Sequence, residues 1–280
     1  MAVFTQPKES AVVVGIYAPL SAEVATLGAS IDVETEYPFG DDAKVTLTNI
    51  KGTVDVTLKM RVPTWATEAT INGKAAKAGT LVTVGVAKKG SAALTATINF
   101  NPKIRTEKWF NDATSVHRGA LMYVKLSTAR LPFFSSIRGT TPADILPSYV
   151  FFRFKRYSLP IMPNYTVYAH HFGDADMSND YYLSPQSKWN YALDESSLSF
   201  NKGSLGKGCA PFNHSNWPNS ISATLREVHS WGIVNNAAAE PPASPACITH
   251  ISACGPPTKL MLVPHGGTEL RIGELPLSGL

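Results

Sequence analysis

Two cysteines and a histidine near the C-terminal end have side chains and a spacing that suit a metal ion. Cys247, His250 and Cys254 follow the pattern Cys-x2-His-x3-Cys, and His265 or Cys209 could supply a fourth ligand. Thiolate and imidazole groups are good zinc ligands, but structural zinc sites usually contain two close pairs of them. Because no second pair is present, we expect no metal site. A Cys247–Cys254 disulfide and three free thiols are both compatible with this spacing.

Paired carboxylates are a second chemical prospect, because glycoside hydrolysis uses two of them. Asp41 is adjacent to Asp42, and Asp194 is adjacent to Glu195. Neighbouring residues of a strand point to opposite faces, so neither pair can flank one glycosidic bond from a single strand. The sequence also contains no Gly-x-Ser-x-Gly motif. We therefore predict no catalytic residue in this chain.

Two further segments match ligand-binding loops only in part. Residues 174–180 place oxygen-bearing side chains at alternating positions, as a calcium loop does, but lack the central glycine and the terminal glutamate of an EF-hand. In the glycine-rich segment 203–208, the first glycine of a P-loop would fall at Asn201, and no serine or threonine follows Lys207. We expect a solvated acidic turn and a flexible loop at these two places.

Tryptophan side chains offer another kind of site, because their faces can stack on the apolar C–H faces of sugar rings. The chain has five of them: Trp65, Trp109, Trp189, Trp217 and Trp231. Packing in a core is the more ordinary role of such residues. Trp217 lies instead in the polar segment 213–219 and is the best candidate for a ligand contact.

Composition favours a globular protein and argues against several partners. The 280 residues are 44% hydrophobic and 16% charged, which allows a sizeable core in one or two domains. A net charge of +4 is too diffuse to indicate nucleic acid, and no apolar run approaches the ~20 residues that cross a bilayer. The N-terminus lacks the pattern of a signal peptide. Sequons at Asn164 and Asn213 leave the location unknown but favour an extracellular or secretory one.

Short strands are the elements that would position these residues. Residues 45–48, 54–62, 81–84 and 94–100 alternate between aliphatic and polar side chains, which is typical of half-buried antiparallel strands. Asn72-Gly73 is a strong two-residue hairpin turn, because both central positions need positive φ. Helical periodicity is scarce. We predict an all-β fold with little helix, in which the chain up to about residue 127 forms one β-sandwich.

The composition changes after residue 131, where aromatic residues become frequent. Residues 150–157, 165–170 and 220–228 are expected to form strands, separated by long irregular stretches. Residues 259–263 and 269–272 are expected to form a terminal hairpin. The sequence thus predicts further strands after the first sandwich.

Several short motifs occur in a fixed order along the chain. They are Tyr37–Gly40, Arg61–Ala66, Ile71–Gly73, His117–Tyr123 and Leu262–Ile272. Each is ordinary alone, but the ordered set resembles the C-terminal half of glycoside hydrolase family 127, the β-L-arabinofuranosidase family of six-hairpin glycosidase-like proteins. In that family a second sandwich is inserted into the first. The resemblance implies that residues 1–127 and 257–280 form the first sandwich and that residues 128–256 form the insert.

The same resemblance implies an enzyme whose chemistry lies outside this chain. Members of the family are retaining enzymes with a cysteine nucleophile held by zinc, further cysteines and a glutamate, all within an upstream helical barrel. None of Cys209, Cys247 and Cys254 lies in a matching motif. We therefore expect a non-catalytic ancillary region, with no cofactor of its own, of a protein that acts when intact on β-L-arabinofuranosides or related glycosides. The expected partners are that N-terminal barrel and, beyond it, glycans or a second copy of the chain.

The alternative is a free-standing β-sandwich protein that binds carbohydrate or forms part of an extracellular structure. Affinity for a glycan and a surface without a large bare apolar patch would favour this alternative. An ancillary region is expected to show the reverse, because it would expose the patch that its barrel covers.

Overall fold

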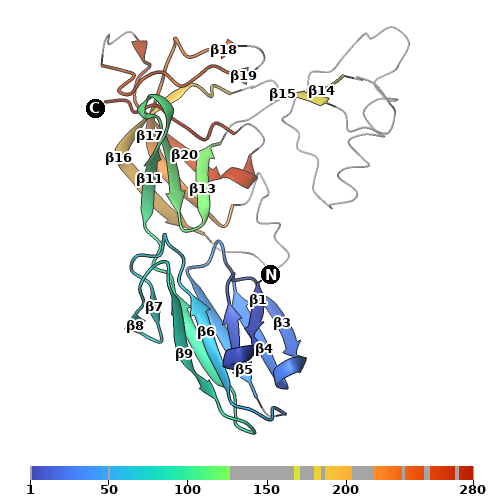
Figure 1. Ribbon diagram of the computed structural model, residues 1–280. Helices are drawn as coiled ribbons and strands as arrows, with labels where there is room; N and C mark the ends of the chain where they lie inside the picture. Colours follow the sequence, from blue (N-terminus) through green and yellow to red (C-terminus); the bar gives the residue numbers. More distant parts are fainter. Residues whose placement is uncertain are drawn as a thin grey trace. The chain divides into compact units, whose positions relative to one another are not determined.

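The computed structural model is all-β, which confirms the predicted fold class (Figure 1). It describes residues 2–49, 51–126, 167–170, 180–183, 187–203, 217–234, 237–248, 253–268 and 271–279. The helical turns of these residues are short 3-10 segments, namely η1 (Pro7–Glu9), η2 (Ala25–Leu27), η3 (Phe110–Asp112) and η5 (His265–Gly267). None of the described helical segments is long and apolar enough to span a membrane.

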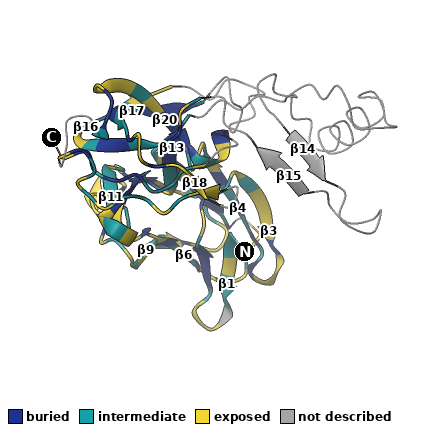
Figure 2. Ribbon diagram, turned by 90° about the horizontal axis from the view of Figure 1, so that it is seen from above, coloured by how far each residue is buried: buried dark blue, intermediate teal, exposed yellow. Residues whose placement is uncertain are grey.

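The chain divides into two compact units. The first comprises Met1–Arg105 and Arg118–Leu121, and the second comprises Thr106–His117 and Met122–Leu280. Each unit has its own sheets and its own buried residues, and Figure 2 colours the ribbon dark blue where residues are buried.

The first unit contains a four-stranded and a six-stranded sheet. The four-stranded sheet has the order β1 (Val3–Gln6), β2 (Ala11–Val14), β6 (Val56–Arg61), β9 (Leu81–Ala87). The six-stranded sheet has the order β3 (Leu20–Val24), β4 (Ala29–Thr35), β5 (Asp42–Thr48), β10 (Leu94–Asn99), β7 (Thr70–Ile71), β8 (Lys74–Ala75). The pairing of β2 with β6 is parallel, so the four-stranded sheet is mixed rather than antiparallel as expected.

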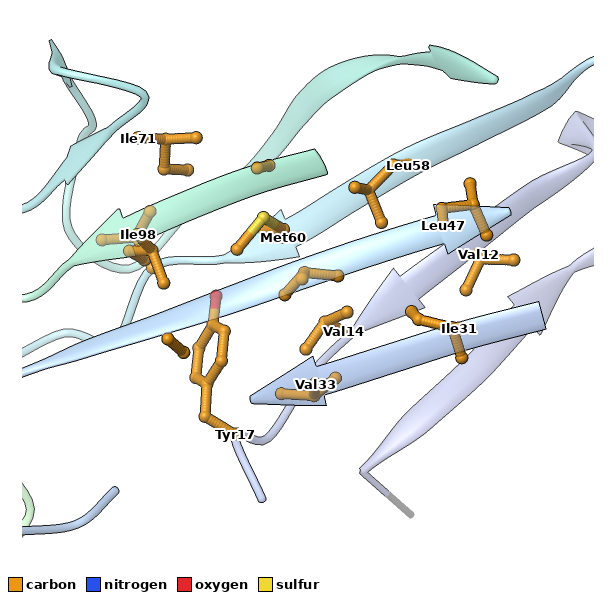
Figure 3. Packing of buried hydrophobic residues seen from close by; sticks show 14 of the residues in the cluster. Val12, Val14, Tyr17, Ile31, Val33, Leu47, Leu58, Met60, Ile71 and Ile98 are labelled. Carbon is orange, nitrogen blue, oxygen red and sulfur yellow. The ribbon is translucent and has the colours of Figure 1, made fainter. Parts of the chain in front are cut away.

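The inward side chains of these two sheets meet in one core (Figure 3). Val12 and Leu58 from the four-stranded sheet and Ile31, Leu47 and Ile98 from the six-stranded sheet have no exposed surface. In β5 and β10 the residues between the buried ones are exposed or half-buried, which is the alternation that a half-buried strand requires. The first unit is therefore a β-sandwich.

The turn at Asn72-Gly73 has the predicted geometry. It joins β7 to β8, in which Thr70 pairs with Ala75 and Ile71 with Lys74. Asn72 has a φ of 49° and Gly73 a φ of 76°, so both central residues adopt the left-handed conformation that a two-residue hairpin needs.

The second unit is built on a six-stranded sheet. Its order is β11 (Ile104–Lys108), β12 (Thr114–Arg118), β13 (Leu121–Lys125), β20 (Thr258–Pro264), β17 (Asn219–Glu227), β16 (Tyr191–Lys202). Two short hairpins are also described, one of β14 (Val167–His170) with β15 (Asp180–Leu183) and one of β18 (Ile233–Val234) with β19 (Ala237–Ala238). The expected strand 150–157 lies outside the described residues.

The division between the units differs from the expected boundaries. Strand β20 pairs with β13, which was assigned to the range 1–127, and with β17, which was assigned to the range 128–256. One sheet thus unites parts of all three predicted ranges, and the units separate near residue 105. Hydrophobic alternation shows which face of a strand is buried, but it does not show which strand is its neighbour. The expected terminal hairpin of residues 259–263 and 269–272 is not observed among the described residues. Strand β20 pairs with β13 and β17 instead, and Arg271 and Ile272 lie outside any strand.

Candidate functional site

Two of the sequence motifs meet in an aromatic cluster of the first unit. Tyr37 follows β4, and Trp65 follows β6. Their ring centroids lie 6.5 Å apart with an angle of 15° between the planes. Phe100 contacts both rings, with centroids 5.6 Å from each of them, and Tyr17 packs edge-on against Phe100 at 5.0 Å. We name these four residues the aromatic cluster.

Local backbone structure holds the two motif residues in place. Strand β6 ends at Arg61, and Pro63 follows it, which has no N–H to continue the ladder. A tight turn comes next, in which the Ala66 N–H donates to the carbonyl oxygen of Pro63 at 3.1 Å. On the other side of the cluster, the Tyr37 N–H donates to the hydroxyl oxygen of Thr35 at 3.0 Å. Both aromatic residues thus leave the end of a strand in a fixed direction.

A small pocket opens beside this cluster. Its volume is about 130 Å³, and its lining includes Tyr17, Tyr37, Arg61, Thr64 and Trp65. The Tyr17 hydroxyl donates to the carbonyl oxygen of Arg61 at 2.7 Å, which fixes the backbone at the rim of the pocket. Burial raises the pKa of Tyr17 and of Tyr37. The positive charge of Arg61 lowers the pKa of both, but its effect is smaller. Both hydroxyls are therefore protonated at neutral pH and can donate hydrogen bonds.

Trp217, the ligand contact predicted from the sequence, is half-buried and packs against η5. Its indole N–H donates to the carbonyl oxygen of Gly267 at 3.2 Å. A Cβ atom at Gly267 would lie 2.7 Å from Cδ1 of Trp217, so only glycine allows this approach. A ligand role for Trp217 stays a prediction. The candidate glycosylation residues Asn164 and Asn213 both lie outside the described residues.

Cys247 and Cys254 form a disulfide, with their Cα atoms 5.5 Å apart. Their sulfur atoms are therefore not thiolate ligands in this structure. His250 and Cys209 lie outside the described residues. Among the residues that are described, no three His, Cys, Asp or Glu side chains come together in a way that could hold a metal ion.

Three of the four carboxylates in the two adjacent pairs, those of Asp41, Asp194 and Glu195, have partners. Asp41 forms a two-pronged ion pair with Arg118, with Nη1–Oδ1 and Nη2–Oδ2 distances of 3.0 and 2.9 Å. Asp194 accepts hydrogen bonds from the backbone N–H and hydroxyl of Ser196, and Glu195 accepts one from the Thr106 hydroxyl. These contacts give the carboxylates structural partners.

A buried serine beside a histidine was missed at the sequence level. The Ser115 hydroxyl oxygen lies 2.9 Å from Nε2 of His117 and accepts a hydrogen bond from the Trp109 indole N–H at 2.8 Å. The nearest oxygen of Glu107 lies 3.8 Å from the same Nε2. A nucleophile triad needs the carboxylate on the other ring nitrogen and an accessible serine. Since Ser115 is only 1% exposed, this arrangement is a structural network.

Lys125 is the second group that the sequence did not reveal. It is 6% exposed, donates a hydrogen bond to the carbonyl oxygen of Lys188, and places Nζ 5.0 Å from the centroid of the Tyr191 ring. Burial lowers the pKa of Lys125 to about 8. The burial of Lys125 could not be predicted from strand alternation, because Tyr123, Val124 and Lys125 are all buried in succession.

A family model matches the part of the chain that contains the aromatic cluster's pocket. Residues 11–92 match the model described as "Beta-L-arabinofuranosidase, GH127 middle domain". Over residues 11–92 the chain is therefore similar to this middle domain, and its fold is all-β. The predicted resemblance to glycoside hydrolase family 127 is confirmed over this range. A search of curated proteins finds no match.

Solved structures that this chain resembles include a protein titled "Glycoside hydrolase", with 13% identity and a TM-score of 0.49 over 99% of this chain and 37% of that one. Ara127N-Se, a GH127 beta-L-arabinofuranosidase from Geobacillus stearothermophilus T6, is 13% identical, with a TM-score of 0.44 over 95% and 32% of the two chains. The GH127 beta-arabinofuranosidase BT3674 is 14% identical, with a TM-score of 0.47 over 96% and 35%. The chain spans about a third of the length of these structures.

Proposed function

We propose that this chain is the non-catalytic ancillary β-sandwich region of a glycosidase-like protein. The observation that carries the proposal is the match of residues 11–92 to a middle domain of β-L-arabinofuranosidases. The fold is all-β, and the carboxylates of Asp41 and Asp194 bind other residues of the chain. Both observations agree with a structural rather than a catalytic role.

The activity of the intact protein follows from the same proposal. It would hydrolyse β-L-arabinofuranosides or related glycosides in a helical barrel that precedes this chain. Zinc and the cysteine nucleophile would belong to that barrel, while the sandwiches would pack against it and stabilise it.

Exposed apolar side chains of the second unit support a partner of this kind. Trp109 is 53% exposed and Phe110 is 58% exposed. Asn111 ties their turn to residues 241–244, because its side-chain amide donates to the Pro241 carbonyl at 2.8 Å and its own carbonyl accepts from Ser244. The preceding hairpin of β18 and β19 exposes Ile233 and Val234 at 55% and 57%. We name Trp109, Phe110, Ile233 and Val234 the exposed apolar set.

An activity comparison tests the proposed function. The purified 280-residue chain is incubated with an aryl β-L-arabinofuranoside, beside the full-length product of the transcript that encodes it. We expect no turnover by the chain alone and turnover by a longer product with a helical half that contains clustered cysteines and a glutamate. Turnover by the chain alone, or a transcript that starts at Met1, would contradict the ancillary role.

The free-standing alternative is favoured by one observation, the Cys247–Cys254 disulfide. Disulfides persist in oxidising compartments, so this bridge supports an extracellular or secretory location, where sugar-binding and structural sandwiches also act. A transcript that starts at Met1, together with secretion of the 280-residue product, would favour this alternative over the ancillary role.

A further inference from the structure

The pocket beside the aromatic cluster combines a free positive charge with hydrogen-bond donors and ring surfaces. Among the described residues, the Arg61 guanidinium makes no ion pair, and its hydrogen bond from Nη1 to the Gly15 carbonyl is long, at 3.5 Å. Neither the Tyr37 hydroxyl nor the Trp65 indole N–H has a hydrogen-bond partner among these residues. We propose that this pocket binds a carboxylate-bearing sugar, a uronate.

Arg61 is the residue proposed to bind the carboxylate of the uronate. A guanidinium has five N–H donors in a planar fork that matches a carboxylate, and its charge persists at every physiological pH. Arg61 is exposed, so a ligand can reach it without opening the fold. The one contact that Nη1 makes leaves most of these donors for a ligand.

The surrounding charges favour an anion over a cation. Trp65 packs against Gly119, since a Cβ there would lie 3.7 Å from its ring. The Gly119 carbonyl accepts a hydrogen bond from Arg105 at 2.7 Å. The nearby carboxylate of Asp41 is already paired with Arg118. The side of the cluster that carries Arg61 therefore keeps a positive charge that no carboxylate of the described residues neutralises.

The aromatic rings of Tyr37 and Trp65 are proposed to bind the ring of the sugar. Tyr37 and Trp65 are half-buried and nearly parallel, so each offers part of its surface at the pocket. The C–H groups of a pyranose can pack on such surfaces while its hydroxyls meet the Tyr37 and Thr64 hydroxyls. A volume of about 130 Å³ is below the range of drug-sized pockets and suits part of one sugar residue.

The test is calorimetric titration of the full 280-residue chain with D-galacturonate and D-glucuronate. D-galactose and D-glucose serve as matched neutral ligands, because they have the same rings with a hydroxymethyl group in place of the carboxylate. Acetate supplies the carboxylate without the ring, and N-acetylglutamate amide supplies an acidic peptide side chain. We expect millimolar binding of at least one uronate, tenfold or more tighter than its neutral partner, acetate or the peptide mimic.

Three variants locate the binding. Arg61→Gln is expected to weaken uronate binding tenfold or more, and Tyr37→Phe about threefold, while both keep the thermal midpoint of the parent. Lys44→Gln, a change of an exposed lysine that pairs with Glu34, is the matched control and should leave affinity unchanged.

The outcomes separate the sources of affinity. Equal binding of uronates and neutral sugars, or of uronates and acetate, would overturn the proposal. Preference for the peptide mimic would overturn it in favour of an acidic protein segment. Uronate binding that survives Arg61→Gln would also overturn it, because the ligand would then lie elsewhere. None of these results depends on a catalytic barrel, so the proposed ancillary role is tested separately.

Discussion

Lys125 is a cationic side chain that the second unit removes from water. Desolvation disfavours the charged form, and burial lowers its pKa from 10.5 to about 8. The Lys188 carbonyl oxygen and the face of the Tyr191 ring compensate only in part. Below pH 8 the folded protein must therefore hold a charged group in an unfavourable place.

Replacing this lysine with a methionine should stabilise the protein near neutral pH. The shift corresponds to about 3 kcal/mol, from which the lost hydrogen bond to Lys188 subtracts about 1 kcal/mol. We expect Lys125→Met to raise the free energy of unfolding at pH 7 by about 2 kcal/mol, measured by urea denaturation.

The sign of the pH dependence provides the check. The folded protein binds fewer protons than the unfolded chain between pH 8 and 10.5, so this lysine makes the parent more stable as pH rises through that window. The advantage of Lys125→Met should shrink between pH 8 and 10. The exposed Lys202 serves as control, and Lys202→Met should have no such effect. An advantage that stays constant with pH would contradict the buried charge.

At the scale of elements, the turn between β7 and β8 depends on the backbone freedom of Gly73. A Cβ at this position would meet no atom within 4 Å, so space is not the constraint. Its φ of 76° is the constraint, because L-residues pay roughly 1–2 kcal/mol in the left-handed region. We expect Gly73→Ala to lower the free energy of unfolding by about 1 kcal/mol in thermal or urea denaturation.

Gly232 is the matched control for this turn. A Cβ there also meets no atom within 4 Å, but its φ is not in the left-handed region. Gly232→Ala should therefore leave stability nearly unchanged. If both variants lost the same stability, the turn geometry would not be the cause.

The disulfide stabilises a different part of the chain, which precedes β20. It links residues separated by 7 positions, and closing so short a loop stabilises by about 2 kcal/mol in the chain-entropy model. We expect the Cys247→Ala, Cys254→Ala double variant to lose about that much in urea denaturation. A reducing agent should destabilise the parent and not the variant. An intact mass without the loss of two hydrogen atoms would show that the bridge is absent.

Strands with clean alternation could be predicted from the sequence, but their neighbours could not. The expected strands 45–48 and 94–100 correspond to β5 and β10, in which every second residue is buried. The pairing of β20 with β13 and with β17 could not be predicted, because a period of two carries no information about pairing. Register between segments far apart in sequence is set by packing in three dimensions.

The sequence did not predict this pocket as a site, although its motifs contain several of the residues that line the pocket. The motifs singled out Tyr37, Arg61 and Trp65, and all three line one pocket. Their contact could not be derived, since it depends on how β4 and β6 end in opposite sheets of the sandwich. Tyr17 belongs to no motif and was missed. The Arg118–Asp41 ion pair joins residues 77 positions apart, a separation that no local pattern reveals.

At the scale of the whole molecule, both units expose apolar side chains, and the most exposed of those described belong to the second unit. The pocket of the first unit is polar and charged, with Arg61 at its rim. The second unit carries the exposed apolar set, in which each side chain is more than half exposed. Adjacent exposed apolar side chains are candidates for an interaction site, and the proposed ancillary role predicts a partner on the second unit.

Polar substitution within this set should change how the whole chain behaves in solution. Phe110 and Val234 are 58% and 57% exposed, so Phe110→Ser with Val234→Ser should alter stability by less than about 0.5 kcal/mol. We expect the double variant to bind several-fold less of a hydrophobic fluorescent dye and to self-associate less at high concentration, measured by sedimentation velocity.

Leu81→Ser in the first unit, where the side chain is 43% exposed, is the control and should change neither property. An equal response of variant and control would mean that the second unit has no special apolar surface, and the proposed contact with a catalytic barrel would lose its structural support.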